Sequence, residues 1–401
     1  MPVIVTAADR ASFRRCRRQW DFGAGMRQDL EPAQRPGLPD LDRAVRDALA
    51  VYYFPGMWDW DRGVRLPLVG QELERALTRQ RQRAGASGDA RADVWQQASG
   101  EGKALLARYV EWAPIADRFA PVLVETDFEV TVLDPARSDT AVIAGHGDPI
   151  RYSGRIDMMA VDQDDAYWIV RHRVVSTDWL PAQQLIADEE SLTACWAWEQ
   201  FYPGMAIAGT IDDELRLPPG PAASAVGPAL ATPGKARRGW PWPRRLARIA
   251  PPTVRQHEPS GGGRSIPQHR RMYARASHPA RAEPVEQLTQ DGFRRTWLRR
   301  TPADVAEAGR RLGDDVAQMA RHDLHVYPEP SDLNCPPCPF LEPCRTMQAG
   351  RDEVPIIRTL YRKRPPEPPQ EGRLGGRAWG LGRGAAPPQF PPRRNGVQGG
   401  A

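Results

Sequence analysis

The chain has 401 residues, of which 41% are hydrophobic and 26% are charged. This length allows one large domain or two ordinary ones, with a hydrophobic core that needs no disulfide bonds. No apolar run approaches the ~20 residues that span a bilayer, and the N-terminus lacks the apolar stretch of a signal peptide. We therefore predict a cytoplasmic protein with no membrane partner, whose five cysteines are metal ligands or reactive thiols rather than disulfides.

The N-terminal third is predicted to be mainly helical. A basic, aromatic helical turn near the start contains Cys16 and offers Asp9 or Ser12 as its N-cap. Apolar residues at helical spacing predict further helices over residues 41–54, 69–83 and 92–112. Pro55 ends the first of these, because proline cannot continue a helix.

The middle of the chain changes to strand-like sequence. Alternating and β-branched residues predict strands over residues 121–133, 152–162 and 166–175. Turn signals separate these strands, which indicates an antiparallel arrangement. A helix over 189–201 and one more strand over 205–217 follow. We predict an α/β (α+β) fold with a central mixed β-sheet flanked by helices and an N-terminal helical part.

Residues 218–282 are rich in Pro, Gly and Arg, so we predict an insertion with little regular structure. Positive charge is concentrated here, since residues 235–300 contain 16 Lys or Arg against 4 Asp or Glu. Such a segment suits phosphate backbones, although an Arg-rich flexible linker explains it equally well. Aromatic residues interleaved with its arginines suit stacking on single-stranded bases, namely Trp240, Trp242 and Tyr273.

A capped helix beginning near Pro302 leads into a cysteine-rich segment. Residues 363–401 are rich in Pro, Gly and Arg and are predicted to form a disordered tail. The sequence KRPPEPPQ at its start and the Pro-rich insertion both suit binding of a protein partner.

The cysteines form the most specific pattern in the chain. Cys335, Cys338 and Cys344 are spaced C-x2-C-x5-C, and prolines between them favour tight turns over helix, so that three thiolates can converge. A tetrathiolate site needs a fourth ligand, which Cys16 or Cys195 can supply. Cys195 lies on an apolar helical face, where a buried inert thiol is the usual role, so Cys16 is favoured.

Four cysteines suit either zinc or a 4Fe-4S cluster, so ligand count alone leaves the metal open. Zinc sites usually pair two C-x2-C hooks. One distant cysteine combined with a triple is more typical of iron–sulfur ligation. A site of this kind would close a loop of most of the chain and tie its two ends together.

These residues resemble the RecB-type nucleases of the PD-(D/E)XK superfamily, in the branch with a four-cysteine iron–sulfur staple. Cys16 with Trp20 matches the family's N-terminal C-x3-aromatic turn, and the C-terminal triple matches its C-x2-C-x5-C. The resemblance covers roughly residues 8–350. It implies a restriction-endonuclease-like core in one domain over residues 1–350, a 4Fe-4S cluster, and DNA or another nucleic acid as the partner.

The resemblance also implies an active site, but its motifs are degenerate here. The G-x-x-D motif is present and ends at Asp157. The catalytic D/E-x-K is replaced by the sequence Arg171-His172-Arg173, and Arg46 stands where the family has a metal-binding His. Positive charge opposes binding of a divalent cation, and an arginine cannot give up a proton.

We therefore expect a catalytically inactive member that binds phosphate through Arg46, Arg171 and Arg173. Two alternatives remain open. The first is an active DNA nuclease that holds magnesium or manganese on relocated carboxylates, with Glu125 and Asp148 beside the remnant Asp157. The second is a scaffold or interaction protein whose nuclease-like domain is an inert remnant.

Overall fold

The structure is a computed structural model that describes residues 3–33, 37–84, 92–175, 178–217, 284–290 and 292–365. The insertion predicted over residues 218–282 lies outside the described residues. So does the predicted tail over residues 363–401, except for its first three residues. The predictions made for these two segments therefore stay predictions.

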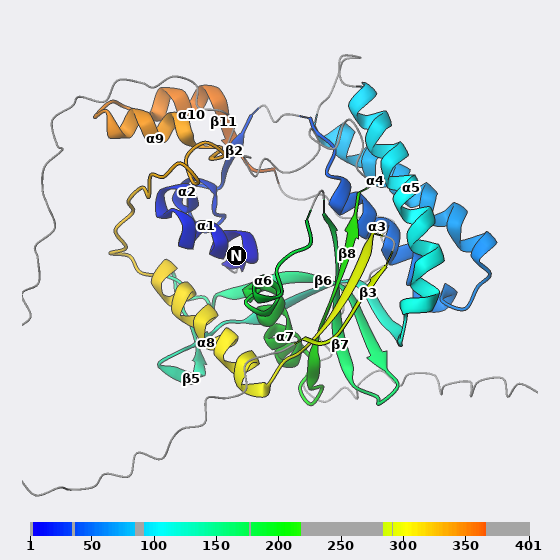
Figure 1. Cartoon of the computed structure of the whole chain (residues 1–401). Helices are drawn as coiled ribbons and strands as arrows, with labels where there is room; N and C mark the ends of the chain where they lie inside the picture. Colours follow the sequence, from blue (N-terminus) through cyan, green and yellow to red (C-terminus); the bar gives the residue numbers. More distant parts are fainter. Residues whose placement is uncertain are drawn as a thin grey trace, which may run out of the picture. The chain divides into compact units, whose positions relative to one another are not determined.

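The helices and strands alternate along the chain, with mainly helices before residue 117 and mainly strands in the middle (Figure 1). The helices are α1 (Ala7–Arg15), α2 (Arg17–Gly23), α3 (Leu41–Tyr52), α4 (Arg62–Arg83), α5 (Ala92–Ala116), α6 (Ala182–Ile186), α7 (Glu189–Phe201), α8 (Pro302–Met319), α9 (Leu341–Gln348) and α10 (Val354–Leu360), with a 3-10 turn η1 (Pro55–Met57). The strands are β1 (Ile4–Thr6), β2 (Leu30–Pro32), β3 (Phe119–Thr131), β4 (Leu133–Asp134), β5 (Arg137–Ala141), β6 (Arg151–Asp162), β7 (Tyr167–Val175), β8 (Ile207–Arg216), β9 (Pro284–Gln290), β10 (Phe293–Arg299) and β11 (Tyr361–Lys363).

The core of the described fold is a seven-stranded mixed sheet. Its order is β1-β6-β7-β8-β10-β9, and β3 pairs with β6 as well. Strands β3, β6 and β7 are antiparallel, whereas β7 and β8 are parallel. Parallel neighbours need a crossover, which α6 and α7 provide. The predicted mixed sheet and the three antiparallel strands are confirmed.

Helices cover both faces of this sheet (Figure 1). Met158 packs into a core with α3, α4 and α5, while its neighbour Met159 packs into a second core with α7 and α8. Successive side chains of a strand point to opposite faces, so one strand contributes to both cores. The prediction of a sheet flanked by helices, with helices at the N-terminal end, is confirmed.

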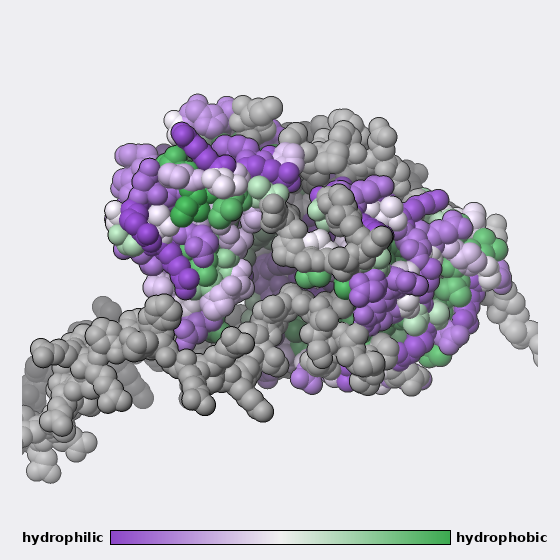
Figure 2. All heavy atoms as spheres, turned by 90° about the horizontal axis from the view of Figure 1, so that it is seen from above, coloured by the Kyte–Doolittle hydropathy of each residue, from purple (hydrophilic) through white to green (hydrophobic). Residues whose placement is uncertain are grey.

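The face of the molecule shown in Figure 2 is mostly hydrophilic, in contrast to the buried cores. Figure 2 shows a largely hydrophilic face on which hydrophobic side chains form only small patches. The large apolar side chains that the sequence places at helical and strand spacing are instead buried between the layers, as Leu49, Leu105 and Trp168 illustrate.

The N-terminus contains a strand that was not predicted and corrects the predicted cap of the first helix. Residues 4–6 form strand β1, which pairs in parallel with the start of β6. Helix α1 is capped by Thr6, rather than by Asp9 or Ser12. The Thr6 hydroxyl accepts from the Asp9 amide at 3.2 Å, and the Asp9 carboxylate accepts from the Thr6 amide at 2.9 Å. Asp9 is thus the third residue of a capping box, not the cap.

Segments from both ends of the chain pack together. Strands β2 and β11 pair, and the ring of Phe340 lies 5.4 Å from those of Phe22 and Tyr361. Regular structure therefore continues to Lys363, beyond the domain boundary predicted at residue 350. The cysteine triple also differs from expectation, since Cys344 lies in helix α9; a proline is tolerated there because it falls in the first turn.

Candidate functional site

Cys16 occupies the junction between α1 and α2, where it is the C-cap of one helix and precedes the next. Its side chain is buried, and the Glu329 amide lies 3.5 Å from its sulfur as a hydrogen-bond donor. The Arg18 amide also donates to the Tyr327 carbonyl at 3.2 Å. These contacts hold the segment before the cysteine triple against the N-terminal helices.

Two of the four cysteines predicted as one ligand set, Cys338 and Cys344, have raised pKa values. Burial raises the pKa of Cys338, and the thiols of Cys16, Cys344 and Cys335 raise it further. Burial raises the pKa of Cys344 as well, against the opposing effect of the Arg18 guanidinium, which donates a hydrogen bond to this sulfur. Hydrogen bonds from the Glu329 amide to the Cys16 sulfur and from the Asn334 side chain to the Arg15 carbonyl bring the segment before the triple next to Cys16.

Cys195 lies elsewhere. It is fully buried in α7 within the core that packs on α8, and burial raises its pKa to about 12. A thiol with such a pKa is protonated at neutral pH and is a poor metal ligand. The geometry thus favours Cys16 over Cys195 as the fourth thiol of the set.

The donor set can be compared with the two candidate groups. Within the described residues, no three His, Cys, Asp or Glu side chains converge as ligands of one metal ion. A 4Fe-4S cluster attaches each thiolate to a different iron, so its ligands surround an object larger than a single ion. The donors from Glu329 and Arg18 suit such a cluster, since hydrogen bonds to the sulfurs tune its potential.

The residues predicted to form a degenerate nuclease motif lie where α3 meets strands β6 and β7. Asp157 accepts a hydrogen bond from the His172 amide at 3.0 Å, and its other oxygen lies 3.7 Å from the Arg46 guanidinium. Burial acts to raise the pKa of Asp157, but Arg46, His172 and Arg171 outweigh it, and the net pKa is lowered. Asp157 is therefore an ionised carboxylate with a guanidinium as its counter-ion.

The two arginines of β7 bind the start of α7. The Arg171 guanidinium lies 2.9 Å from both Asp188 and Glu190. Arg173 pairs with Asp188 too, and its Nε lies 3.3 Å from Asp212 on β8. Asp188 is also the N-cap of α7. The Asp188 carboxylate thus binds both arginines and caps the start of α7.

These ion pairs define the charge of the site. The guanidiniums of Arg46, Arg171 and Arg173 face the five carboxylates of Asp42, Asp157, Asp188, Glu190 and Asp212. A phosphate would have to compete with these carboxylates for each arginine. A divalent cation would have to displace the arginine guanidiniums from these carboxylates.

No protein-family model matches the sequence, and a search of curated proteins found no similar sequence. Among the described residues, no helix is both long enough and apolar enough to cross a membrane.

Behind β7, on the opposite face from Arg171, lies a buried charged network that the sequence analysis missed. Arg295 is fully buried and lies 2.7 Å from Asp213 and 2.6 Å from Asp117. Burial raises the pKa of Asp117 to about 6. Burial also lowers the pKa of His172, against the pull of Asp213, so this imidazole is neutral at pH 7. A visible signal was the acidic run IDDEL in an otherwise apolar strand.

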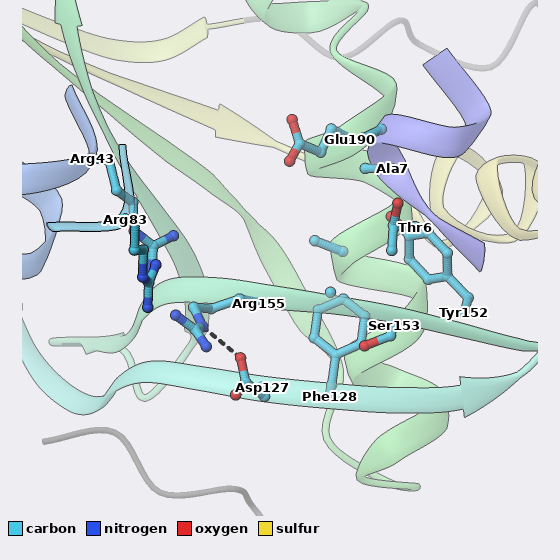
Figure 3. A pocket seen from close by; sticks show the side chains of 13 residues that line it. Thr6, Ala7, Arg43, Arg83, Asp127, Phe128, Tyr152, Ser153, Arg155 and Glu190 are labelled. Atoms are coloured by element: carbon cyan, nitrogen blue, oxygen red, sulfur yellow. Dashed lines mark hydrogen bonds and ion pairs between the residues drawn. The ribbon is translucent and has the colours of Figure 1, made fainter. Parts of the chain in front are cut away.

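A pocket of about 370 Å³, here called the β6 pocket, lies beside Arg43, Arg83 and Arg155 (Figure 3). The residues that line it come from β1, α1, α3, α4, β3, β6 and α7: Thr6, Ala7, Ala8, Arg43, Arg83, Asp127, Phe128, Tyr152, Ser153, Gly154, Arg155, Glu190 and Ala194. This volume is within the range of small-ligand sites in proteins.

Glu125 lies at the cationic end of this pocket. Its carboxylate lies 3.1 Å from Arg155 and 3.3 Å from Arg43. Its backbone has φ of 45°, a left-handed conformation that is rare for residues other than glycine. Burial raises its pKa to about 7, with Asp157 and Asp47 acting in the same direction and Arg43 and Arg155 opposing. Glu125 therefore titrates near neutral pH.

We expect Glu125→Gln to stabilise the protein at pH 8 by about 3 kcal/mol, since each pKa unit corresponds to roughly 1.4 kcal/mol. Between the ordinary glutamate pKa of 4.5 and the raised value of about 7, the folded state binds more protons at Glu125 than the unfolded state does. Wild-type stability therefore falls over this window as pH rises, and the glutamine variant avoids that loss. Urea unfolding at pH 5 and pH 8 measures the difference, which should nearly vanish at pH 5.

The matched control is Glu129→Gln on the same strand, where the carboxylate is partly exposed and pairs with Arg151. This variant should show no such pH-dependent gain. A Glu125→Gln protein that is less stable than wild type at pH 8 would contradict the assignment of Glu125 as a strained, buried carboxylate.

Proposed function

We propose that this protein is a catalytically inactive nuclease-like domain of the RecB type, which binds DNA or another nucleic acid and holds a 4Fe-4S cluster. The observation that carries the proposal is the position of Arg171, bound between Asp188 and Glu190 where an active relative would hold a divalent cation. The order of elements supports it, because Asp157 and Arg171 lie on adjacent antiparallel strands that lead through a helical crossover into a parallel strand. This order suits a restriction-endonuclease-like core.

Inactivity follows from charge and proton chemistry. A nuclease of this kind needs carboxylates to hold magnesium or manganese and a lysine to position the attacking water. Here Asp157 is matched with Arg46, and Arg173 takes the position of the lysine. A guanidinium among the carboxylates repels a second cation, and its fixed planar fork is a poor substitute for a lysine ammonium.

The alternative of an active nuclease, with its metal ion held by Glu125, Asp148 and Asp157, receives little support from the positions of these residues. Glu125 is bound to two arginines. Asp148 is half-exposed beside His146, in the turn before β6. Asp157 lies six residues along that strand from its start at Arg151, which corresponds to roughly 20 Å. Asp148 and Asp157 therefore cannot share one metal ion.

The cluster part of the proposal is supported by the spacing of the cysteines in the sequence and by the contact between Glu329 and Cys16. Cys16, Cys335, Cys338 and Cys344 would supply four thiolates, and a cluster would supply a covalent tie between the two ends of the fold. Zinc is the alternative occupant. Arg18 and the amide of Glu329 would hold two of the sulfurs in place through hydrogen bonds.

The test is a cleavage assay and a binding assay on the same purified protein. With magnesium or manganese we expect no cleavage of single- or double-stranded DNA. Binding should be detectable at low salt, and the logarithm of the affinity should fall linearly with the logarithm of salt concentration. Metal-dependent cleavage would overturn the inactive assignment, and absence of binding would favour an interaction protein.

A designed variant adds a control for the site itself. Arg171→Asp with Arg173→Lys restores the D-x-K pattern beside Asp157 and removes the guanidinium from among the carboxylates. We expect calorimetry to detect manganese binding to this variant and none to wild type at the same site. Equal behaviour of the two proteins would contradict the proposed equivalence of these positions.

A further inference from the structure

The β6 pocket has two chemically different ends. Figure 3 shows Arg43, Arg83 and Arg155 gathered on one side, while Thr6 and Glu190 lie on the other. Three guanidiniums that converge on one end provide a strong anion-binding surface, since each carries several fixed donors. The opposite end offers a hydroxyl and a carboxylate, which suit the polar edge of a larger molecule.

Arg83 is the most available of the three arginines. It is exposed in the last turn of α4 and forms no ion pair with any described residue. Its guanidinium nevertheless points toward those of Arg43 and Arg155, as Figure 3 shows. Arg43 and Arg155 pair with carboxylates, so Arg83 adds positive charge that the described residues of this end do not neutralise.

Arg43 and Arg155 share an internal counter-ion. Both contact Glu125, while Arg43 also contacts Asp47 at 3.1 Å and Arg155 contacts Asp127 at 2.5 Å. The charged groups that face Glu125 are thus Arg43 and Asp47 of α3 and Arg155 and Asp157 of β6. An incoming anion would compete with Glu125 for the two guanidiniums, and protonation of Glu125 would release them.

We propose that the β6 pocket binds a phosphate monoester, with its phosphate at Arg43, Arg83 and Arg155 and the attached nucleoside extending toward Thr6 and Glu190. This inference rests on the proposed nucleic-acid binding and narrows it to the phosphorylated end of a strand or to a free nucleotide. A monoester carries nearly two negative charges and three strong acceptor oxygens, which match three guanidiniums better than the single charge of an internal phosphodiester. The pocket volume of about 370 Å³ suits one nucleotide.

The first test compares the affinities of one oligonucleotide carrying a 5′-phosphate, a 3′-phosphate or hydroxyls at both ends. We expect one phosphorylated form to bind about tenfold more tightly than the hydroxyl form, as a single good charge-assisted contact provides. Inorganic phosphate and a nucleoside monophosphate should abolish this difference by competition. If the monophosphate alone binds, the ligand is a free nucleotide rather than a strand end.

Matched variants on α4 locate the effect. Arg83→Gln should remove the gain from the terminal phosphate, whereas Arg81→Gln, in the same exposed turn but outside the pocket, should leave it unchanged. Both changes are at the end of a helix, so both variants should fold. Equal effects of the two variants, or an equal affinity for phosphorylated and hydroxyl ends, would overturn the inference.

Glu125→Gln tests the counter-ion. In wild type the gain from the phosphate should increase as pH falls from 8 to 6, because protonated Glu125 no longer competes for Arg43 and Arg155. The glutamine variant should show the larger gain at pH 8, and the two proteins should show nearly the same gain at pH 6. A wild-type-like pH response in this variant would contradict the role given to Glu125.

The two proposals can fail separately. Equal binding of oligonucleotides with and without a terminal phosphate would contradict only the proposal that the β6 pocket binds a phosphate monoester. Absence of binding to any oligonucleotide, with Arg83-dependent binding of the nucleoside monophosphate, would sink nucleic-acid binding and leave the pocket assignment standing. Loss of both would overturn both.

Discussion

Replacing Arg295 by Met should destabilise the fold by about 3–5 kcal/mol, because it leaves two buried carboxylates without their counter-ion. Arg295 is fully buried on β10 and binds Asp213 of β8 and Asp117 after α5. The hydroxyls of Tyr53 and Tyr109 also lie 3.3 and 3.2 Å from its guanidinium. Loss of this one side chain thus disconnects two strands and two helices at once.

Urea unfolding at pH 8 and pH 5 measures this effect. Asp117 and Asp213 would become protonated more easily in the variant, so the difference from wild type should be smaller at pH 5. Arg299→Met on the exposed end of the same strand is the control and should cost less than 1 kcal/mol, as surface changes usually do. A similarly small loss for Arg295→Met would contradict the assigned network.

Replacing Cys16 by Ala should abolish metal binding. If the proposed cluster is present, anaerobically purified wild-type protein should contain about four irons per chain and absorb broadly near ~400 nm. The Cys16→Ala protein should lose both signals, and its end segments should become sensitive to proteolysis. A structural metal site can contribute on the order of 10 kcal/mol to folding, so the unfolding temperature should fall as well.

Cys195→Ala is the matched control for this experiment. The Cys195 thiol is buried in the core between α7 and α8, which contains none of the other four cysteines, so the iron content should not change. Wild-type protein that contains one zinc per chain and no iron would show that the four cysteines bind zinc instead of a 4Fe-4S cluster. Iron retained after loss of Cys16 would contradict the four-cysteine set.

The regular part of the fold could be predicted because its signals are local. Helix α7 has the bounds that its sequence predicts, since Asp188 caps its start and Pro203-Gly204 follows its end. Strands β1, β2 and β11 could not be predicted. Each has three residues and pairs with a segment distant in sequence, so no periodicity reveals it.

Some residues of the candidate site could also be predicted from the sequence, and others could not. The order of motifs along the chain indicated Arg46, Asp157 and the arginines of β7 as neighbours. Their partners Asp188 and Asp212 were missed, because an ion pair between a strand and a helix start depends on tertiary packing. Asp188 had a local signal only for its other role, as an N-cap residue before a predicted helix.

The pairing of β2 with β11 sets the timing of folding during synthesis. Residues 30–32 remain without their strand partner until residues 361–363 have left the ribosome. The ring of Phe22 likewise has no contact with that of Phe340 until residue 340 has emerged. Contacts separated by more than 300 residues form slowly, because a long loop must close first. This step of folding should therefore wait until residues 361–363 have emerged, with Leu30 exposed to other proteins until then.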